Sequence, residues 1–402
     1  MGSGLLATVN RAAGHTAQWA AVALGLSIPI STALDSILLP VVVAGWLASG
    51  AWREKWEVAR DNRVAIAALA LFGLLLLGTL YGERNPGDAA LILRKYVDLL
   101  WIPVLLWVFR DGAMREKAVY ALAISIAFVM LVSFLVKFGV IPEIRAQSGV
   151  SLNAVFMKTR QTHGLLMAFG AFLFLHLALK AVSRRMRILW GVLAALAVAN
   201  GTLVVMGATG YVLIGALALY LGAVWKGWRG IASAAVTMAA VVAVLMTVPG
   251  PFRERVSLIR TEIATWRPGV MEHHSSAGTR LELYRVSVAL IKDRPVLGHG
   301  TGSFTKAFAD KSRGLGFEPQ RNPHNEYLNM LVQLGLAGLA GLLFLFITHW
   351  RLAPGLATPL ECHLARGLIL AMAIGCLFNS WLMDHTEGLL YVWLTGLLFA
   401  GL

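Results

Sequence analysis

Long, nearly uninterrupted apolar runs recur along this chain, and short polar connections separate them. A helix needs about 20 apolar residues to cross the hydrocarbon core of a bilayer, so runs of this length predict membrane spans. The pattern predicts an all-α polytopic membrane protein with about twelve such spans. They lie near Gln18–Ile30, Ala33–Ala48, Val64–Tyr81, Leu91–Phe109, Val119–Val140, Gly164–Leu179, Ile188–Val205, Gly210–Trp225, Ile231–Val248, Glu326–Trp350, Leu364–Met383 and Gly388–Leu402.

Composition agrees with this pattern. Of the 402 residues, 58% are hydrophobic and only 14% are charged, which excludes an ordinary soluble domain. The predicted organisation is membrane helices over 1–248, one large polar loop over 249–323, and membrane helices again over 324–402. The N-terminus lacks a cleavable signal pattern, so the first apolar run is predicted to be a retained span.

Lysine and arginine predict the orientation. Every second short connection is rich in these residues, for example around Arg53 to Arg63 and around Lys180 to Arg187. The positive-inside rule assigns these connections, and both termini, to the cytoplasm. The loop over 249–323 then faces outward, and long loops are exempt from the rule. The net charge of +14 follows partly from this bias and requires no nucleic-acid partner.

The large loop contains two predicted helices. Thr279 and Glu282 have the spacing of a capping box, which predicts a helix start. Its predicted apolar stripe is Leu281, Tyr284, Val288 and Ile291. A second short helix is predicted from Phe304 to Lys311.

A polar stretch from Arg321 to Asn329 leads directly into the apolar run after Met330. Asn322 is a suitable cap and Pro323 suits the first helical position, which predicts His324 in the first turn. The positive helix end there disfavours imidazolium, and a neutral histidine can accept a proton as a general base. The alternative is an interfacial histidine without a catalytic role.

Basic residues on the predicted outer face exceed what topology requires. Guanidinium groups match phosphate oxygens, so the sequence predicts a lipid-carrier diphosphate as ligand rather than a nucleotide. The alternative is surface arginines that contact anionic membrane lipid. Arg280 is a candidate catalytic residue beside His324. The candidate binding residues are Arg160, Arg145, Lys95, His163, Lys158, Arg285, Asn325 and Tyr327.

The predicted outer face shows no metal-ligand cluster, so no metal and no other cofactor is expected. The segment Gly298–Gly302 looks like a phosphate loop but lacks the following Gly-Lys-Ser/Thr and a preceding strand. It is interpreted as a turn. Asp384, His385 and Glu387 form an acidic cluster that either orients a base or is only solvated.

Two sets of motifs resemble the O-antigen ligase and polymerase superfamily. The first is Pro323-His324-Asn325-Glu326-Tyr327-Leu328 followed by Leu334–Leu339. The second is Gly278-Thr279-Arg280 with Arg294–Phe304, which is similar to the large periplasmic loop of that group. One position departs from the pattern, because such ligases usually carry an arginine where this chain has Ala208. Either Arg160 has taken over that role or this chain is impaired.

The resemblance implies an inverting, metal-independent glycosyltransferase of the GT-C type in the bacterial inner membrane. It implies transfer of a glycan from undecaprenyl diphosphate to a hydroxyl of the lipid A–core oligosaccharide at the periplasmic face. A polymerase of the same superfamily is the first alternative, because only the acceptor differs. A secondary transporter is the second, although transport favours ionisable residues at mid-membrane rather than at helix ends.

Overall fold

The structure is a computed structural model that describes residues 2–82, 86–142, 155, 158–270, 275–315, 317 and 320–402. Its regular elements in these ranges are all helical, which confirms the predicted all-α class. They are α1 (Gly2–Ser27), α2 (Thr32–Ala48), α3 (Trp52–Asp61), α4 (Arg63–Leu77), η1 (Gly78–Leu80), α5 (Pro86–Tyr96), η2 (Val97–Leu100), α6 (Trp101–Val108), α7 (Gly112–Lys137), α8 (Arg160–Lys180), α9 (Arg184–Ala199), η3 (Asn200–Val204), α10 (Ala208–Thr247), α11 (Pro251–Thr265), α12 (Ser276–Asp293), α13 (Phe304–Lys311), α14 (Glu326–Leu352), η4 (Ala353–Gly355), α15 (Pro359–Gly375) and α16 (His385–Phe399).

Six helical segments in the described part of the chain are long and apolar enough to cross a membrane. A seventh is counted if α2 and α3, which meet at 115°, form one broken span. These segments support a multi-pass membrane protein, and the number of about twelve spans stays a prediction. The six are Arg63–Leu80, Gly112–Lys137, Arg160–Lys180, Arg184–Val204, Ala208–Thr247 and Glu326–Gly355.

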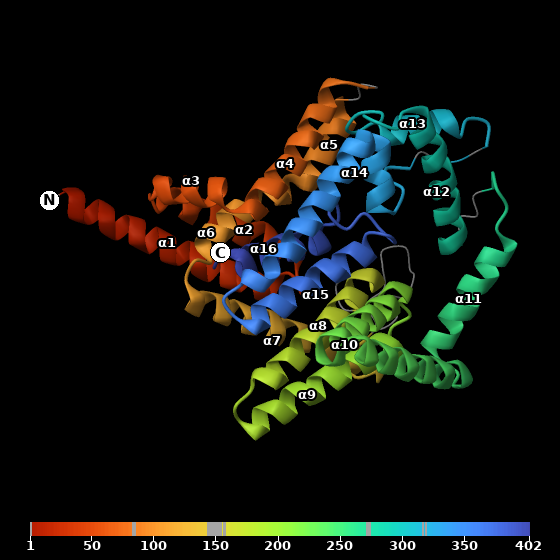
Figure 1. The fold of residues 1–402 in the computed structure, drawn as a ribbon, viewed down its shortest axis with the longest axis horizontal. Helices are drawn as coiled ribbons and strands as arrows, with labels where there is room; N and C mark the ends of the chain where they lie inside the picture. The colour runs from red at the N-terminus through yellow and green to blue at the C-terminus, as the bar shows by residue number, and fades with distance from the viewer. Residues whose placement is uncertain are drawn as a thin grey trace.

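Helix α16 lies at the centre of the bundle. It is apolar on all sides, as expected for a helix enclosed by others, and it packs against α6 and α15. The Trp393 ring meets Phe109 edge to face at 5.8 Å, and its indole N–H donates to the Ala21 carbonyl at 2.7 Å. Around this core the helices α11, α12 and α13 gather on one side, while α1 projects on the other (Figure 1).

Helix α14 is broken at Gly335, whose φ of 63° and ψ of −151° leave the helical region. The segment before α13 satisfies the backbone groups that the break frees. The Leu336 amide donates to the Pro295 carbonyl at 2.9 Å, and the Gly300 amide donates to the Gln333 carbonyl at 2.8 Å. Unpaired backbone groups are costly at membrane depth, so this segment stabilises the break.

The structure corrects the predicted start of the first loop helix. Ser275 caps α12 by accepting from the Gly278 amide at 3.0 Å, so Thr279 lies inside the helix and forms no capping box. Glu282 is fully buried and accepts from the Gly269 amide at 3.2 Å instead. Glu262 of α11 accepts from the Ser276 and Ala277 amides, and this contact from another helix favours the start at Ser275.

The predicted apolar stripe of that helix is confirmed only in part. Half-buried Tyr284 and Ile291 pack against the loop core, whereas Val288 is 43% exposed. The fully buried residues of α12 in this core are Leu283, Val286 and Leu290. The predicted second helix, from Phe304 to Lys311, is confirmed with the same bounds as α13. The buried face of α12 contacts α13 and α14, so these helices form one small apolar cluster beside the bundle.

Candidate active site

The entry to α14 differs from the prediction. Asn325, rather than Asn322, is the N-cap, because its side chain accepts from the Leu328 amide at 3.0 Å. Its amide group also donates to the Leu377 carbonyl after α15, at 3.0 Å. Asn325 thus joins two helices, which a sequence pattern does not reveal. His324 consequently precedes the cap and is not part of the first turn.

His324 has a left-handed backbone with φ of 51°, one of two such non-glycine residues in the described chain. A conformation of this kind costs about 1–3 kcal/mol and persists only where the surroundings enforce it. Two contacts enforce it here. The His324 amide donates to Asn322 Oδ1 at 2.8 Å, and the Tyr284 hydroxyl donates to the His324 carbonyl at 3.3 Å. The strained turn therefore fixes where the imidazole lies.

The His324 ring is oriented by Asn379. Nδ1 lies 2.7 Å from Asn379 Oδ1, while Asn379 Nδ2 donates to Asp384 Oδ2 at 2.5 Å and to Gln161 Oε1 at 3.1 Å. Because both of these partners are acceptors, the amide nitrogen must face them and the amide oxygen must face the ring. The neutral ring then carries its hydrogen on Nδ1. Nε2 keeps a lone pair and has no hydrogen-bond partner among the described residues, as a general base requires.

Asp384 anchors this network. Burial raises the pKa of its carboxyl group, and the positive charge of Lys95 opposes that rise. Its two sequence neighbours in the predicted acidic cluster lie elsewhere: His385 pairs with Asp35 at 3.2 Å, and Glu387 accepts from Thr162 at 2.6 Å. Only Asp384 therefore belongs to the hydrogen-bond network of His324.

Arg280 lies on α12, one turn before Tyr284, whose hydroxyl contacts the His324 carbonyl. Its guanidinium makes no hydrogen bond or ion pair with any described residue. Burial lowers its pKa, and Arg255 of α11 lowers it further. Glu262 is the nearby carboxylate, but it accepts from the Ser276 and Ala277 amides at 3.3 and 2.8 Å. The charge of Arg255 thus reaches Arg280, and neither guanidinium forms a hydrogen bond or ion pair within the described part of the chain.

Three more predicted binding residues lie around this centre. Arg160 is the exposed first residue of α8, and it adjoins Gln161 of the Asn379 network. Lys95 is exposed at the end of α5 and lies near Asp384. Lys158 is buried, donates to Thr386 Oγ1 at 3.0 Å, and burial lowers its pKa. Arg145 lies outside the described residues.

The remaining predicted binding residues are engaged within the fold. Arg285 pairs with the buried Glu282 at 2.5 Å. His163 is fully buried and its Nε2 lies 2.7 Å from Asn200 Oδ1. The Tyr327 hydroxyl donates to the Ala373 carbonyl at 2.7 Å. His163 and Tyr327, like Asn325, link segments that are distant in sequence, whereas Arg285 is paired within α12.

Sequence reasoning missed four residues of this centre: Asn379, Gln161, Tyr284 and Arg255. Tyr284 appeared only as part of an apolar stripe, and Gln161 follows the predicted Arg160 directly. Nothing in the local sequence marks Asn379 or Arg255, because their roles depend on contacts with distant segments. Among the described residues no group of three or more His, Cys, Asp or Glu side chains could hold a metal ion.

Residues 202–343 match a family model described as O-Antigen ligase. The matched range extends from η3 into α14, so it includes Arg255, Arg280 and His324 but ends before Asn379 and Asp384. A search of curated proteins found no match to this chain.

Proposed function

We propose that this member of the O-antigen ligase superfamily transfers a glycan from undecaprenyl diphosphate to a hydroxyl of the lipid A–core oligosaccharide. The observation that carries the proposal is the state of His324. Its Nδ1 faces Asn379 Oδ1 at 2.7 Å, which leaves Nε2 as an acceptor, and Tyr284, which contacts the His324 carbonyl, lies one helical turn from Arg280. Glycosyl transfer from a diphosphate requires at least a general base and a site that binds the anionic leaving group.

In this mechanism His324 Nε2 removes the proton of the acceptor hydroxyl as its oxygen attacks the anomeric carbon. The bond from that carbon to the diphosphate oxygen breaks on the opposite face, so the configuration inverts. Arg280 and Arg255 stabilise the charge that develops on the leaving diphosphate, which is a large contribution in a site of low dielectric constant. Diphosphate leaves readily as an anion, so no general acid is needed.

Arg160 is proposed to supply the charge that relatives place at the position of Ala208. Gly207 directly precedes Ala208, and a Cβ on Gly207 would lie 3.4 Å from the Arg160 carbonyl oxygen. The start of α8 and the start of α10 are therefore adjacent, so a side chain from Arg160 can serve the same space. Lys95, which is exposed, is proposed as an outer contact of the diphosphate.

The orientation supports action at the periplasmic face of the bacterial inner membrane, because the basic short connections are predicted to be cytoplasmic. The three parts of the chain, 1–248, 249–323 and 324–402, would then be membrane helices, a periplasmic loop and membrane helices. Helices α11, α12 and α13 fall within the second part. No metal or other cofactor is included in the mechanism.

The test uses purified protein, undecaprenyl-diphosphate-linked glycan and rough lipopolysaccharide, without metal or nucleotide. A ligase yields lipopolysaccharide of higher mass. A polymerase of the same superfamily instead yields longer glycans on undecaprenyl diphosphate when the lipopolysaccharide is omitted. If neither product forms while labelled substrate crosses the bilayer of a proteoliposome, the protein is a transporter and the proposal is wrong.

A further inference from the structure

The second half of α10 turns back along the first at a tight bend. Lys226 and Gly227 have non-helical dihedral angles there. The halves cross where a Cβ on Gly230 would lie 1.9 Å from the Gly222 carbonyl oxygen, which only glycine permits. So close a crossing leaves no room for side chains inside the bend, and residues Trp225 to Arg229 are all exposed.

The tip of this bend pairs two indoles with two cations. Trp225 and Trp228 are 77% and 74% exposed. The Lys226 ammonium lies 4.4 Å from the centroid of the Trp225 ring, and the Arg229 guanidinium lies 5.6 Å from the centroid of the Trp228 ring. Exposed indoles beside cations are typical of the interface between a membrane and water, where the rings lie among the lipid headgroups.

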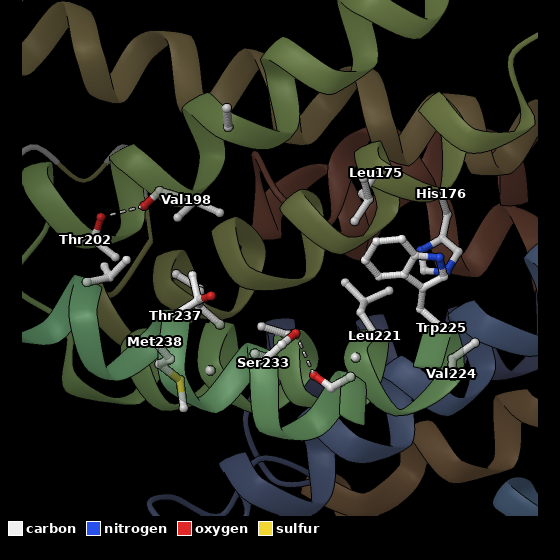
Figure 2. A pocket seen from close by; sticks show the side chains of 18 of the residues that line it. Leu175, His176, Val198, Thr202, Leu221, Val224, Trp225, Ser233, Thr237 and Met238 are labelled. Atoms are coloured by element: carbon white, nitrogen blue, oxygen red, sulfur yellow. Dashed lines mark hydrogen bonds between the residues drawn. The ribbon is translucent and has the colours of Figure 1, made fainter. Parts of the chain in front are cut away.

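A second group of cations lies at the same end of the bundle, in the turn between α8 and α9. Figure 2 shows His176 of α8 and Trp225 of α10 toward one end of the apolar cavity between these helices. Lys180 follows His176 by one turn and also lines that end. Three exposed arginines then begin α9. Together with the two cations of the bend they form what we call the basic patch: Arg184, Arg185, Arg187, Lys226 and Arg229.

The chain supplies almost no negative charge to neutralise the basic patch. The sequence contains no aspartate or glutamate from residue 144 to residue 253. Glu116 of α7 approaches the turn after α8, but it pairs with Lys180 at 2.7 Å. Within the described residues no carboxylate forms an ion pair with a member of the basic patch. Its positive charge is therefore available to an anion from outside the chain.

Helix α3 provides an internal comparison. It also exposes two indoles, because Trp52 and Trp56 are 55% and 66% exposed. Its cations, however, are paired within the helix. Arg53 pairs with Glu57 at 2.9 Å, and Arg60 pairs with the next residue, an aspartate, at 2.7 Å. An anionic ligand is thus expected at the basic patch rather than at α3.

Helix α9 continues the basic patch with hydrocarbon. Ile188, Val192 and Leu196 follow Arg184 at intervals of four residues, so they lie on the same side of the helix. Their side chains are 55%, 49% and 40% exposed. A ligand that covers this side must have an anionic head and a hydrocarbon body, and a phospholipid has both.

The basic patch is separate from the candidate active site. Helix α8 begins at Arg160, beside that site, and ends at Lys180, so at 1.5 Å per residue its ends are about 30 Å apart. This length equals the hydrocarbon thickness of a bilayer, ~30 Å, which places the patch at the opposite membrane face. That face is the predicted cytoplasmic one, because the turn between α8 and α9 belongs to the basic short connections.

We propose that the basic patch binds the headgroup of an anionic phospholipid in the cytoplasmic leaflet, with the acyl chains along α9. Guanidinium forks match the oxygens of a phosphate. A cluster of lysines and arginines at the end of membrane helices favours anionic over zwitterionic headgroups, because a zwitterionic headgroup also carries a positive charge. The inference does not depend on glycan transfer.

The experiment measures lipid binding to the purified protein in detergent. The protein is titrated with cardiolipin, phosphatidylglycerol and phosphatidylethanolamine, and native mass spectrometry gives the fraction of protein that retains each lipid. The wild type should bind the two anionic lipids at least tenfold more tightly than phosphatidylethanolamine. Two double variants, Arg184→Gln with Arg185→Gln and Lys226→Gln with Arg229→Gln, should each weaken binding of the anionic lipids about tenfold.

Two controls accompany these variants. Arg53→Gln with Arg60→Gln removes two cations from α3 on the same predicted face, and it should leave the binding of anionic lipid unchanged. Arg280→Ala at the candidate active site should also leave it unchanged. Thermal unfolding in detergent checks the fold of every variant. Because the two patch variants lie on different helices, misfolding of one leaves the other as a test.

Four results would overturn the proposal. Anionic and zwitterionic lipids bind the wild type equally well, or the α3 control loses as much affinity as the patch variants do. A third is an equal loss in Arg280→Ala, which would place the lipid at the candidate active site. The fourth is binding of polyglutamate at the patch without binding of anionic lipid, which would assign this surface to an acidic protein.

Discussion

Replacing Asn379 with leucine removes the group that orients the His324 ring while keeping its approximate volume. In the ground state the lost bond joins two neutral groups over 2.7 Å. As His324 takes up the acceptor proton it becomes imidazolium, and the same bond then involves a charge. Hydrogen bonds to charged groups contribute about 1.5–3 kcal/mol, and each 1.4 kcal/mol changes a rate about tenfold. Asn379→Leu should therefore lower kcat by about 10–100-fold, with little change in the KM of the donor.

The assay compares Asn379→Leu with two controls under saturating donor and acceptor. Gln161→Leu removes only the outer bond to Asn379, at 3.1 Å, and should reduce kcat less than tenfold. Asn379→Asp can still accept from Nδ1 and should regain part of the activity. Its carboxylate also stabilises imidazolium, so the acidic limb of the kcat/KM profile should move to higher pH. Unchanged kcat in a correctly folded Asn379→Leu protein would refute the orienting role.

Five further outcomes are expected. His324→Ala should lower turnover by about 10²–10⁴-fold without loss of folding, as judged by thermal unfolding in detergent; near-normal turnover would exclude it as the base. Arg280→Lys should fail to restore what Arg280→Ala loses in donor affinity, because an ammonium group cannot form a bidentate contact. The transfer activity lost in Arg160→Ala should be regained when Ala208→Arg is added. An additive loss of activity in the double variant would disprove that Arg160 supplies the charge otherwise placed at position 208. Glycan transfer should continue in excess chelator. A loss of activity that one particular metal ion restores would contradict a metal-independent mechanism. Burial lowers the pKa of Lys158, so just below pH 10.5 the unfolded state binds more protons than the folded state. The free energy of unfolding of the wild type, relative to that of Lys158→Met, should therefore rise as the pH approaches 10.5. A difference that does not change with pH would argue against a buried lysine.

Local patterns predicted the helical elements well where one sequence signal was sufficient. The bounds of α13 agree with the prediction, and the start of α14 lies within three residues of it. Both errors in capping arose where the chain offers two candidates, Asn322 or Asn325 and Ser275 or Thr279. In each case a contact from a distant segment favours one of them, and the bond from Asn325 to the Leu377 carbonyl is an example.

The candidate site was predicted only in part, for a related reason. His324 and Arg280 were found because their surroundings in the sequence are distinctive. Their partners Asn379 and Arg255 belong to segments 55 and 25 residues away, as the differences 379 − 324 and 280 − 255 give, and neither stands in a motif. Conversely, His163 and Arg285 carry suitable chemistry but are bound by Asn200 and Glu282. Tertiary pairing, and not residue type, decides which polar groups are left for a ligand.

The break in α14 makes two distant glycines dependent on each other. A Cβ on Gly335 would lie 2.3 Å from the carbonyl carbon and oxygen of Val296, and one on Gly298 would lie 2.6 Å from the Gly335 nitrogen. Neither glycine can be exchanged while the other backbone stays where it is. A chimaera that imports the loop of a relative must therefore import the matching part of α14 as well. Otherwise the grafted loop displaces α14, which begins beside His324. Activity would then be lost because of a backbone clash, although no catalytic residue had changed.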